Sequence, residues 1–270
     1  MSKFHKVIKY CALAFSVFLV VSILSGIANG FDILSGIFSD NEVELYDELK
    51  STKLINDEIK DLDIKLNASE LVFKIGDELK VETNNKKINV EEKVYKLLIS
   101  EKKSSLFSKN NNSLLVITIP EEYLFDLVNI EAGAGKIDIE QLNAKVLDFE
   151  LGAGKVDISK LNVSDKASIE GGAGSVTISS SNINNLDLDI GVGTFTLHSK
   201  LTGKNEIDAG VGTLKINLID SLDNYNIKVS KGVGSIRLNK ETIKDKKSYG
   251  TGNNYITIDG GVGDISIKTN

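Results

Sequence analysis

From residue 128 onward, apolar and polar residues alternate on both sides of a recurring glycine bend. The repeated unit is apolar–acidic–x–Gly–(Ala/Val)–Gly–x–apolar–x–apolar. Apolar side chains at every second position are typical of strands with one buried face, so each copy predicts two short strands joined by a bend. The seven copies begin at Ile130, Phe149, Ile169, Leu188, Ile207, Val229 and Ile258.

Two glycines mark the bend of every copy. The first glycines follow one another at intervals of 19, 20, 19, 19, 22 and 29 residues, and periods of this size indicate stacked repeats. We expect the glycines to allow a positive φ and the Ala or Val between them to pack into the corner. These structural turn glycines are Gly133, Gly135, Gly152, Gly154, Gly172, Gly174, Gly191, Gly193, Gly210, Gly212, Gly232, Gly234, Gly261 and Gly263.

Two short strands cannot bury their apolar face alone, so the copies must pack on one another. The pattern therefore predicts an all-β fold, a parallel β-solenoid (β-helix) of about seven rungs stacked at ~4.8 Å. An array of β-hairpins, each turning at Gly-x-Gly, is the alternative. Residues 240–254 are polar and rich in lysine, which predicts a protruding, solvated loop. Single apolar residues should line a third side of the rungs: Leu142, Leu161, Ile183 and Leu201.

The residues before the repeats also alternate between apolar and polar types. Between residues 59 and 119 the alternating segments are separated by Gly-Asp or Asn-rich breaks, which predicts further strands. These strands are expected to cap the open end of the repeat stack, because an exposed sheet edge favours aggregation. Residues 40–58 are mostly polar and predict a short helix or stalk.

An uncharged segment from Tyr10 to Phe31 is long enough to cross ~30 Å of hydrocarbon as a helix. Lysines precede it at positions 3, 6 and 9, which predicts that the N-terminal end stays cytoplasmic and the remainder is exported. A cleavable signal peptide is the alternative, since Gly26, Ile27 and Ala28 offer a small-residue cleavage site.

The chain thus divides into five predicted parts. These are a cytoplasmic N-terminus (1–9), a transmembrane helix (10–31), a linker or stalk (32–58), an N-terminal β cap (59–120) and the β-solenoid repeat domain (121–270). The predicted location is the cell membrane, with a single pass and an extracytoplasmic C-terminal domain. The formal charge of the whole chain is −6, which disfavours nucleic acid as a partner.

Candidate chemistry is sparse, and the sequence predicts neither an enzyme nor a bound cofactor. Cys11 is the only cysteine, Arg237 is the only arginine, and His198 is the only histidine outside the N-terminal segment. The usual nucleophile–base sets cannot be assembled from these residues. Gly133 to Lys136 resembles part of a phosphate loop, but Ile137 replaces the hydroxyl residue that a Walker motif needs.

One column of side chains is a candidate for cation binding. The position two residues before the first glycine is acidic in most copies and, if the copies stack in register, its carboxylates form a ladder. A solvated acidic face is the favoured interpretation, and a ladder that binds divalent cations is the alternative. The ladder residues are Glu131, Glu150, Glu170, Asp189 and Asp208.

The strand before Pro120 and the Gly-(Ala/Val)-Gly-x-apolar-x-apolar units resemble a bacterial putative-adhesin family of unknown function, related to the toast-rack envelope proteins. The resemblance covers about residues 59–270 and implies an exported or membrane-anchored β-solenoid, without catalytic residues to carry over.

The predicted function is that of a non-catalytic, membrane-anchored envelope module for surface binding, adhesion or scaffolding. Its partners would be the membrane and either a cell-wall polymer or another envelope protein, with its own copies as a further candidate. An accessory component of envelope stress signalling is the alternative function. A carbohydrate-active β-helix enzyme is a remote one, because uniform outward columns leave no local site.

Overall fold

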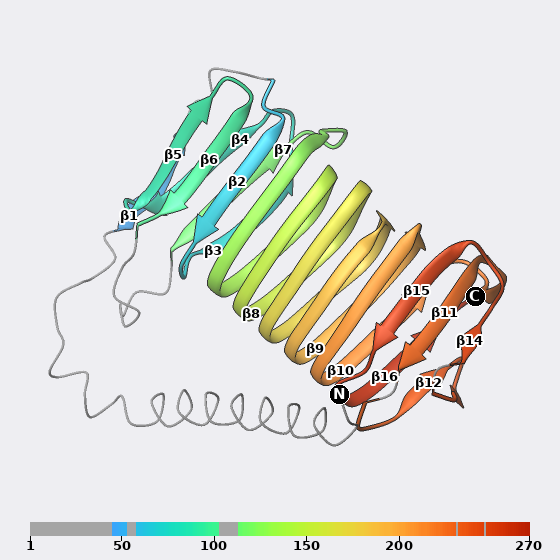
Figure 1. The fold of residues 1–270 in the computed structure, drawn as a ribbon. Coiled ribbons are helices and arrows are strands. Elements are labelled where there is room, and N and C mark those ends of the chain that lie inside the picture. The colour runs from blue at the N-terminus through green and yellow to red at the C-terminus, as the bar shows by residue number, and fades with distance from the viewer. Residues whose placement is uncertain (1–44, 53–57, 103–112, 231, 246) are drawn as a thin grey trace, which may run out of the picture. The chain divides into compact units, whose positions relative to one another are not determined.

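The computed structural model describes residues 45–52, 58–102, 113–230, 232–245 and 247–270 (Figure 1). These residues fall in a compact unit that spans Val43–Asn270. All sixteen strands of this unit belong to one sheet. The described part contains no α-helix and a single 3₁₀ turn, η1 (Leu222–Asn224). The predicted all-β fold is therefore confirmed.

The glycine-containing repeats lie in seven strands. Strand β8 (Phe125–Asn184) contains the first three repeats without interruption, while β9 (Leu186–Thr202) and β10 (Lys204–Leu218) contain the fourth and the fifth. Repeat 6 is split into β11 (Tyr225–Ser230) and β12 (Ile236–Leu238). Repeat 7 is split into β15 (Asn254–Asp259) and β16 (Val262–Lys268).

Successive repeats pair in parallel and in register. Leu188 of β9 is aligned with Ile169 of β8 on one side and with Ile207 of β10 on the other. All three side chains are buried, so the period-2 alternation places one apolar column inside the stack. In repeats 4, 5 and 7 the strands on both sides of the bend pair in parallel with neighbouring repeats, which is not the pairing of a β-hairpin. The predicted third-side residues Leu142, Leu161, Ile183 and Leu201 are buried as well.

The last two repeats do not stack in the order of the sequence. Strands β15 and β16 of repeat 7 pair with β10 of repeat 5, and on their other side they pair with β11 and β12 of repeat 6. Repeat 7 is therefore inserted between repeats 5 and 6, as Figure 1 shows at the orange and red end of the strand series. Both repeats carry the same glycine bend and apolar positions, so the apolar pattern alone does not determine which of them pairs with β10.

The segment between repeats 6 and 7 closes the end of the stack. Strand β13 (Glu241–Thr242) pairs with β12, and β14 (Ser248–Tyr249) pairs with β11, both antiparallel. Ile243 between them is buried. The prediction that residues 240–254 form a protruding loop is wrong, because this segment covers the edge that repeat 6 would otherwise expose.

Residues before β8 continue the stack and then close it. Strands β2 (Asp61–Leu66) and β3 (Glu70–Ile75) pair in parallel with β8, and β6 (Lys96–Glu101) and β7 (Leu114–Ile119) pair in parallel with β2 and β3. Beyond them the pairing turns antiparallel: β5 (Ile88–Lys93) lies on β6 and β4 (Lys80–Asn85) on β7.

The final strand of this end is β1 (Leu45–Thr52), which pairs antiparallel with β4. The sequence predicted a helix or stalk in this part of the chain, and that prediction is wrong for residues 45–52. Its polar composition suits an edge strand, which has few neighbours to bury its side chains.

The predicted transmembrane helix, residues 10–31, lies outside the described residues, as does the predicted cytoplasmic N-terminus. Within the described ranges, no helix has the length and apolar character needed to span a bilayer.

Candidate binding surfaces

The glycine bends are packed backbone against backbone. In every repeat the second glycine has a φ between 136° and 148°, a conformation that side chains disfavour. A Cβ atom added to Gly193 would lie 1.8 Å from the carbonyl oxygen of Gly174 in the preceding repeat. At Gly191, whose φ is not in this region, the corresponding distance to the oxygen of Gly172 is 2.1 Å. A side chain at either glycine would therefore clash with the neighbouring repeat, and at the second glycine the positive φ is a further reason for glycine.

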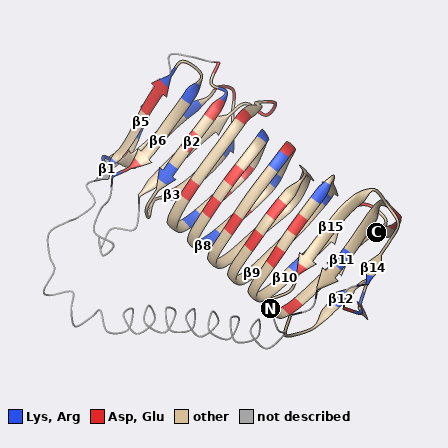
Figure 2. Cartoon of the chain, in the orientation of Figure 1, with Lys and Arg blue, Asp and Glu red and all other residues tan. Residues whose placement is uncertain are grey.

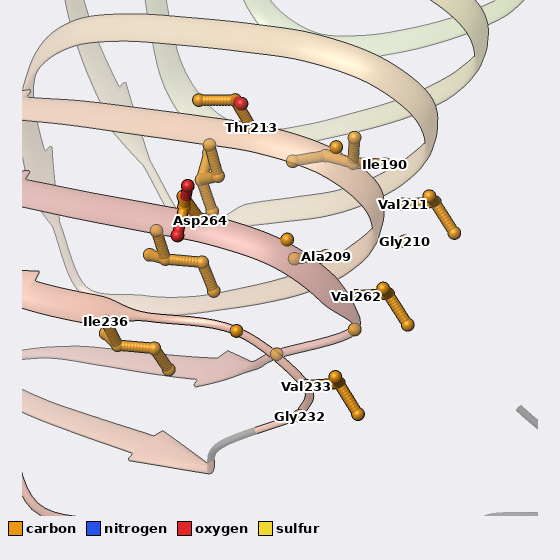
Figure 3. Close-up of a pocket in the computed structure, with 17 residues that line it drawn as sticks. Ile190, Ala209, Gly210, Val211, Thr213, Gly232, Val233, Ile236, Val262 and Asp264 are labelled. Atoms are coloured by element: carbon orange, nitrogen blue, oxygen red, sulfur yellow. The ribbon is translucent and has the colours of Figure 1, made fainter.

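The residue between the two glycines points outward. In Figure 3, Val211, Val262 and Val233 lie in a row on the outer side of the bend and point away from it. Val233 is 71% exposed and Val262 is 37% exposed. The expectation that this residue packs into the corner is wrong, because the inner side of the bend is filled by the residue before the first glycine, such as Ile190 or Ala209.

The space inside the bends is too small for a ligand. The cavity lined by Ile190, Ala209 and Ile236 measures about 20 Å³, and the one beside Ala132 and Val176 about 40 Å³. Pockets that hold small molecules are usually ~300–1,000 Å³. Candidate binding surfaces are therefore on the outside of the repeats.

The acidic column on the outside is longer than the sequence suggested. Register places Glu170 next to Asp189, and Asp189 next to Asp208. Because repeat 7 is inserted after repeat 5, the neighbour of Asp208 is Asp259, and Ser230 follows only after it. We call Glu131, Glu150, Glu170, Asp189, Asp208 and Asp259 the acidic ladder. Figure 2 shows acidic residues on the successive strands of this face.

One end of the acidic ladder is neutralised. Lys65 of β2 is the register partner of Glu131 and donates a hydrogen bond to its carboxylate. This contact, together with Glu131 and Glu150 as nearby charges, raises the pKa of Lys65. Beside it, Glu131, Glu150 and Glu170 border an open depression of about 640 Å³. Among the residues with described positions, no group of three or more His, Cys, Asp or Glu side chains is arranged to hold a metal ion.

Asp208 lies near the other end of the ladder, between Asp189 and Asp259. Burial raises the pKa of the Asp208 carboxyl, and the negative charges of Asp189 and Asp259 raise it further. The folded chain therefore holds this proton more tightly than the unfolded chain does. By linkage, the contribution of Asp208 to the free energy of unfolding falls as the pH rises through its folded-state pKa.

We expect Asp208→Asn to raise the melting temperature at pH 7, because it removes this repulsion. The gain should stay below about 1 kcal/mol, since solvent screens a largely exposed carboxylate, and should vanish below the ordinary aspartate pKa of ~3.9. Thermal unfolding of residues 43–270 across pH 3–8 tests this, with Asp77→Asn, an exposed change outside the ladder, as the control. Equal shifts for both variants at pH 7 would show that the ladder carries no specific repulsion.

The turn between β2 and β3 has no glycine pair and is built around a buried carboxylate instead. Glu101, only 9% exposed, accepts hydrogen bonds from the backbone N–H groups of Asn67, Ala68 and Ser69 at 2.7, 3.1 and 3.3 Å. Asn85 and the Ser69 hydroxyl donate to its other oxygen. Successive N–H groups that converge on an anion form a nest. Sequence reasoning missed this residue, because nothing in the pattern around Glu101 distinguishes it from an exposed glutamate.

The residues considered for catalysis are dispersed. His198 and Arg237 are both exposed and lie on different repeats.

At a corner of the first three repeats, Asn162 donates to Asn143 at 2.8 Å, and Asn182 donates to Asn162 at 3.1 Å. These hydrogen bonds between asparagines link successive repeats and stabilise their stacking.

A family model described as Toastrack DUF4097 matches residues 58–242. The chain belongs to this family. The match confirms the resemblance to toast-rack proteins that the glycine repeats suggested. The Toastrack range ends at Thr242, so the inserted repeat 7 lies beyond it.

Several solved structures are similar to this Toastrack chain. A putative adhesin from Bacteroides fragilis NCTC 9343 is 17% identical, over 83% of this chain and 98% of that chain, with a TM-score of 0.44. A putative adhesin from Parabacteroides merdae ATCC 43184 is 12% identical, over 84% and 99%, with a TM-score of 0.44. A putative cell adhesion protein from Clostridium sporogenes ATCC 15579 is 19% identical, over 83% and 99%, with a TM-score of 0.37. None of the curated protein sequences compared with the chain matches it.

Proposed function

We propose that this Toastrack chain is a non-catalytic, membrane-anchored module of the cell envelope, whose β-solenoid presents a repetitive polar surface for binding or adhesion. The observation that carries the proposal is the in-register parallel stack, in which equivalent positions of successive repeats form outward columns. Such columns suit an extended partner, because each repeat offers a similar contact and weak contacts add along the stack.

The edge strands of the sheet also support an exposed module. At one end β1 and β5 flank the parallel strands, and at the other β13 and β14 do so, all antiparallel. A long, apolar edge strand would tend to pair with further copies edge to edge. Because β1 is polar and β13 and β14 are two residues long, such pairing is disfavoured and the broad faces are the surfaces available to a partner.

The membrane anchor is proposed from the apolar segment 10–31, which is preceded by three lysines. Protease added to intact, wall-stripped cells should degrade a tag at the C-terminus of the full chain. Complete protection of the tag, under conditions that cleave a known surface protein, would refute the extracytoplasmic placement.

The binding role is tested with the purified full chain and isolated cell walls. We expect the chain to co-sediment with the walls and to release no soluble sugar from them. Release of reducing ends would instead support the carbohydrate-active alternative. Failure to co-sediment with walls, with membranes and with other envelope proteins would remove the binding role.

A further inference from the structure

Many lysines of the described residues form ion pairs, which are Lys65, Lys80, Lys93, Lys96, Lys136, Lys145, Lys155, Lys166 and Lys200. In the later repeats, Lys215, Arg237 and Lys268 are exposed, and none of them forms an ion pair with another described residue. Their charges are available to a partner.

These three cations lie at positions next to Ser266 in the sheet. Ser266 of β16 is the register partner of Lys215 in β10 and, on its other side, of Arg237 in β12. Lys268 follows two residues later on β16 and so projects from the same face. Neighbouring strands lie ~4.8 Å apart and residues i and i+2 of a strand ~7 Å apart, so the three cations lie within reach of one bound group. We call Lys215, Arg237, Ser266 and Lys268 the cationic cluster.

Asp264, two residues before Ser266 on β16, is already engaged. Asp264 accepts hydrogen bonds from the hydroxyl and the backbone N–H of Ser235, at 2.5 and 3.3 Å. These bonds lower the pKa of Asp264, and the charge of Arg237 lowers it further. Asp264 therefore offsets part of the Arg237 charge and leaves Lys215 and Lys268 without a counter-ion.

The positions around the cluster add neutral donors. Thr196 of β9 is the register partner of Lys215, and Thr213 and Asn217 lie two residues before and two residues after Lys215 on β10. The acidic ladder lies on the strands at the other side of the glycine bend. A polyanion is therefore repelled by the acidic ladder and attracted by the cationic cluster.

We propose that the cationic cluster binds the phosphate groups of an anionic polymer. Arg237 is the only arginine of the chain, and its planar fork matches two oxygens of one phosphate, which a lysine cannot do. Lys215, Arg237 and Lys268 are exposed on three neighbouring strands, so the surface suits a flexible polymer that contacts several repeats. This proposal rests on the proposed function and adds to it the class of ligand and the face that holds it.

The proposal is tested with the full chain and fluorescently labelled polyphosphate at low salt, followed by anisotropy. Lys215→Gln/Arg237→Gln/Lys268→Gln should raise the Kd roughly tenfold, as expected for the loss of three exposed charged contacts. Lys136→Gln/Lys155→Gln/Lys200→Gln is the matched control, because it removes the same net charge from lysines that are already in ion pairs. An equal loss in both triple variants would overturn the site in favour of net charge alone.

A further variant and a set of competing anions complete the binding experiment. Ser266→Glu places a carboxylate among the cations and should weaken binding as much as the triple variant, with a thermal unfolding curve that confirms folding. Polyglutamate is the competing polymer, and inorganic phosphate the small-anion competitor. If polyglutamate binds as tightly as polyphosphate, or polyphosphate does not bind, the phosphate assignment is overturned. Co-sedimentation with cell walls that persists in either case would leave the wider binding role intact.

Discussion

Replacing Gly193 with alanine is expected to lower the free energy of unfolding by roughly 3–5 kcal/mol. The φ of 142° at this position is strained for any residue with a Cβ atom. In addition, that atom would lie 1.8 Å from the carbonyl oxygen of Gly174. The clash is with backbone, which no side-chain movement relieves, so repeats 3 and 4 would have to separate at the bend. Thermal unfolding of residues 43–270 measures the effect.

The control for this prediction is the neighbouring residue. Val192 is the register partner of Val211, which points outward at the bend, so Val192→Ala should change the free energy of unfolding by no more than about 0.5 kcal/mol. A Gly193→Ala protein that melts within a degree or two of the Val192→Ala protein would show that the bends are not packed backbone to backbone.

The interleaved order of the last repeats predicts an all-or-none cross-linking result. In a Cys11→Ser background, cysteines at positions 208 and 259 should form a disulfide under mild oxidation, because these residues are register partners. Cysteines at 208 and 230 should not, because Asp259 lies between Asp208 and Ser230. Two strand spacings, ~9.6 Å, exceed the Cα separation of about 7 Å that a disulfide can bridge.

Peptide mapping of the oxidised proteins by mass spectrometry distinguishes the two orders. Stacking in the order of the sequence predicts the opposite outcome, in which the 208/230 pair cross-links and the 208/259 pair does not. That result would also remove the sixth carboxylate from its place beside Asp208 and would separate Lys215 from Ser266.

Much of the molecule could be derived from the order of apolar and polar residues. Alternation around Leu188 and Ile207 identified which side chains face inward, because a strand has a period of two. The glycines of the bends could be recognised because a corner in a closely stacked chain leaves no room for side chains. The acidic ladder followed from the same register once the copies were aligned.

Other features depend on contacts between segments that are far apart in the sequence. Glu101 is buried where it accepts hydrogen bonds from the N–H groups of residues 67–69, more than thirty residues earlier. No local sequence pattern predicts such a contact. The outward direction of Val233 depends on how the bend is filled from inside. Residues 240–254 are polar, yet they cover an edge that exists only when repeat 6 lies at the end of the stack.

The repeat, its inward face, its bends and the family to which they belong could be derived from the order of residues alone, because these are properties of each repeat and its neighbours along the chain. The order in which similar repeats stack depends on the folded chain. Repeats 6 and 7 have the same apolar positions and the same Gly-Val-Gly bend, so the apolar pattern does not distinguish which of them pairs with β10, and in the structure it is repeat 7. That selection places Asp259 in the acidic ladder and Ser266 between Lys215 and Arg237.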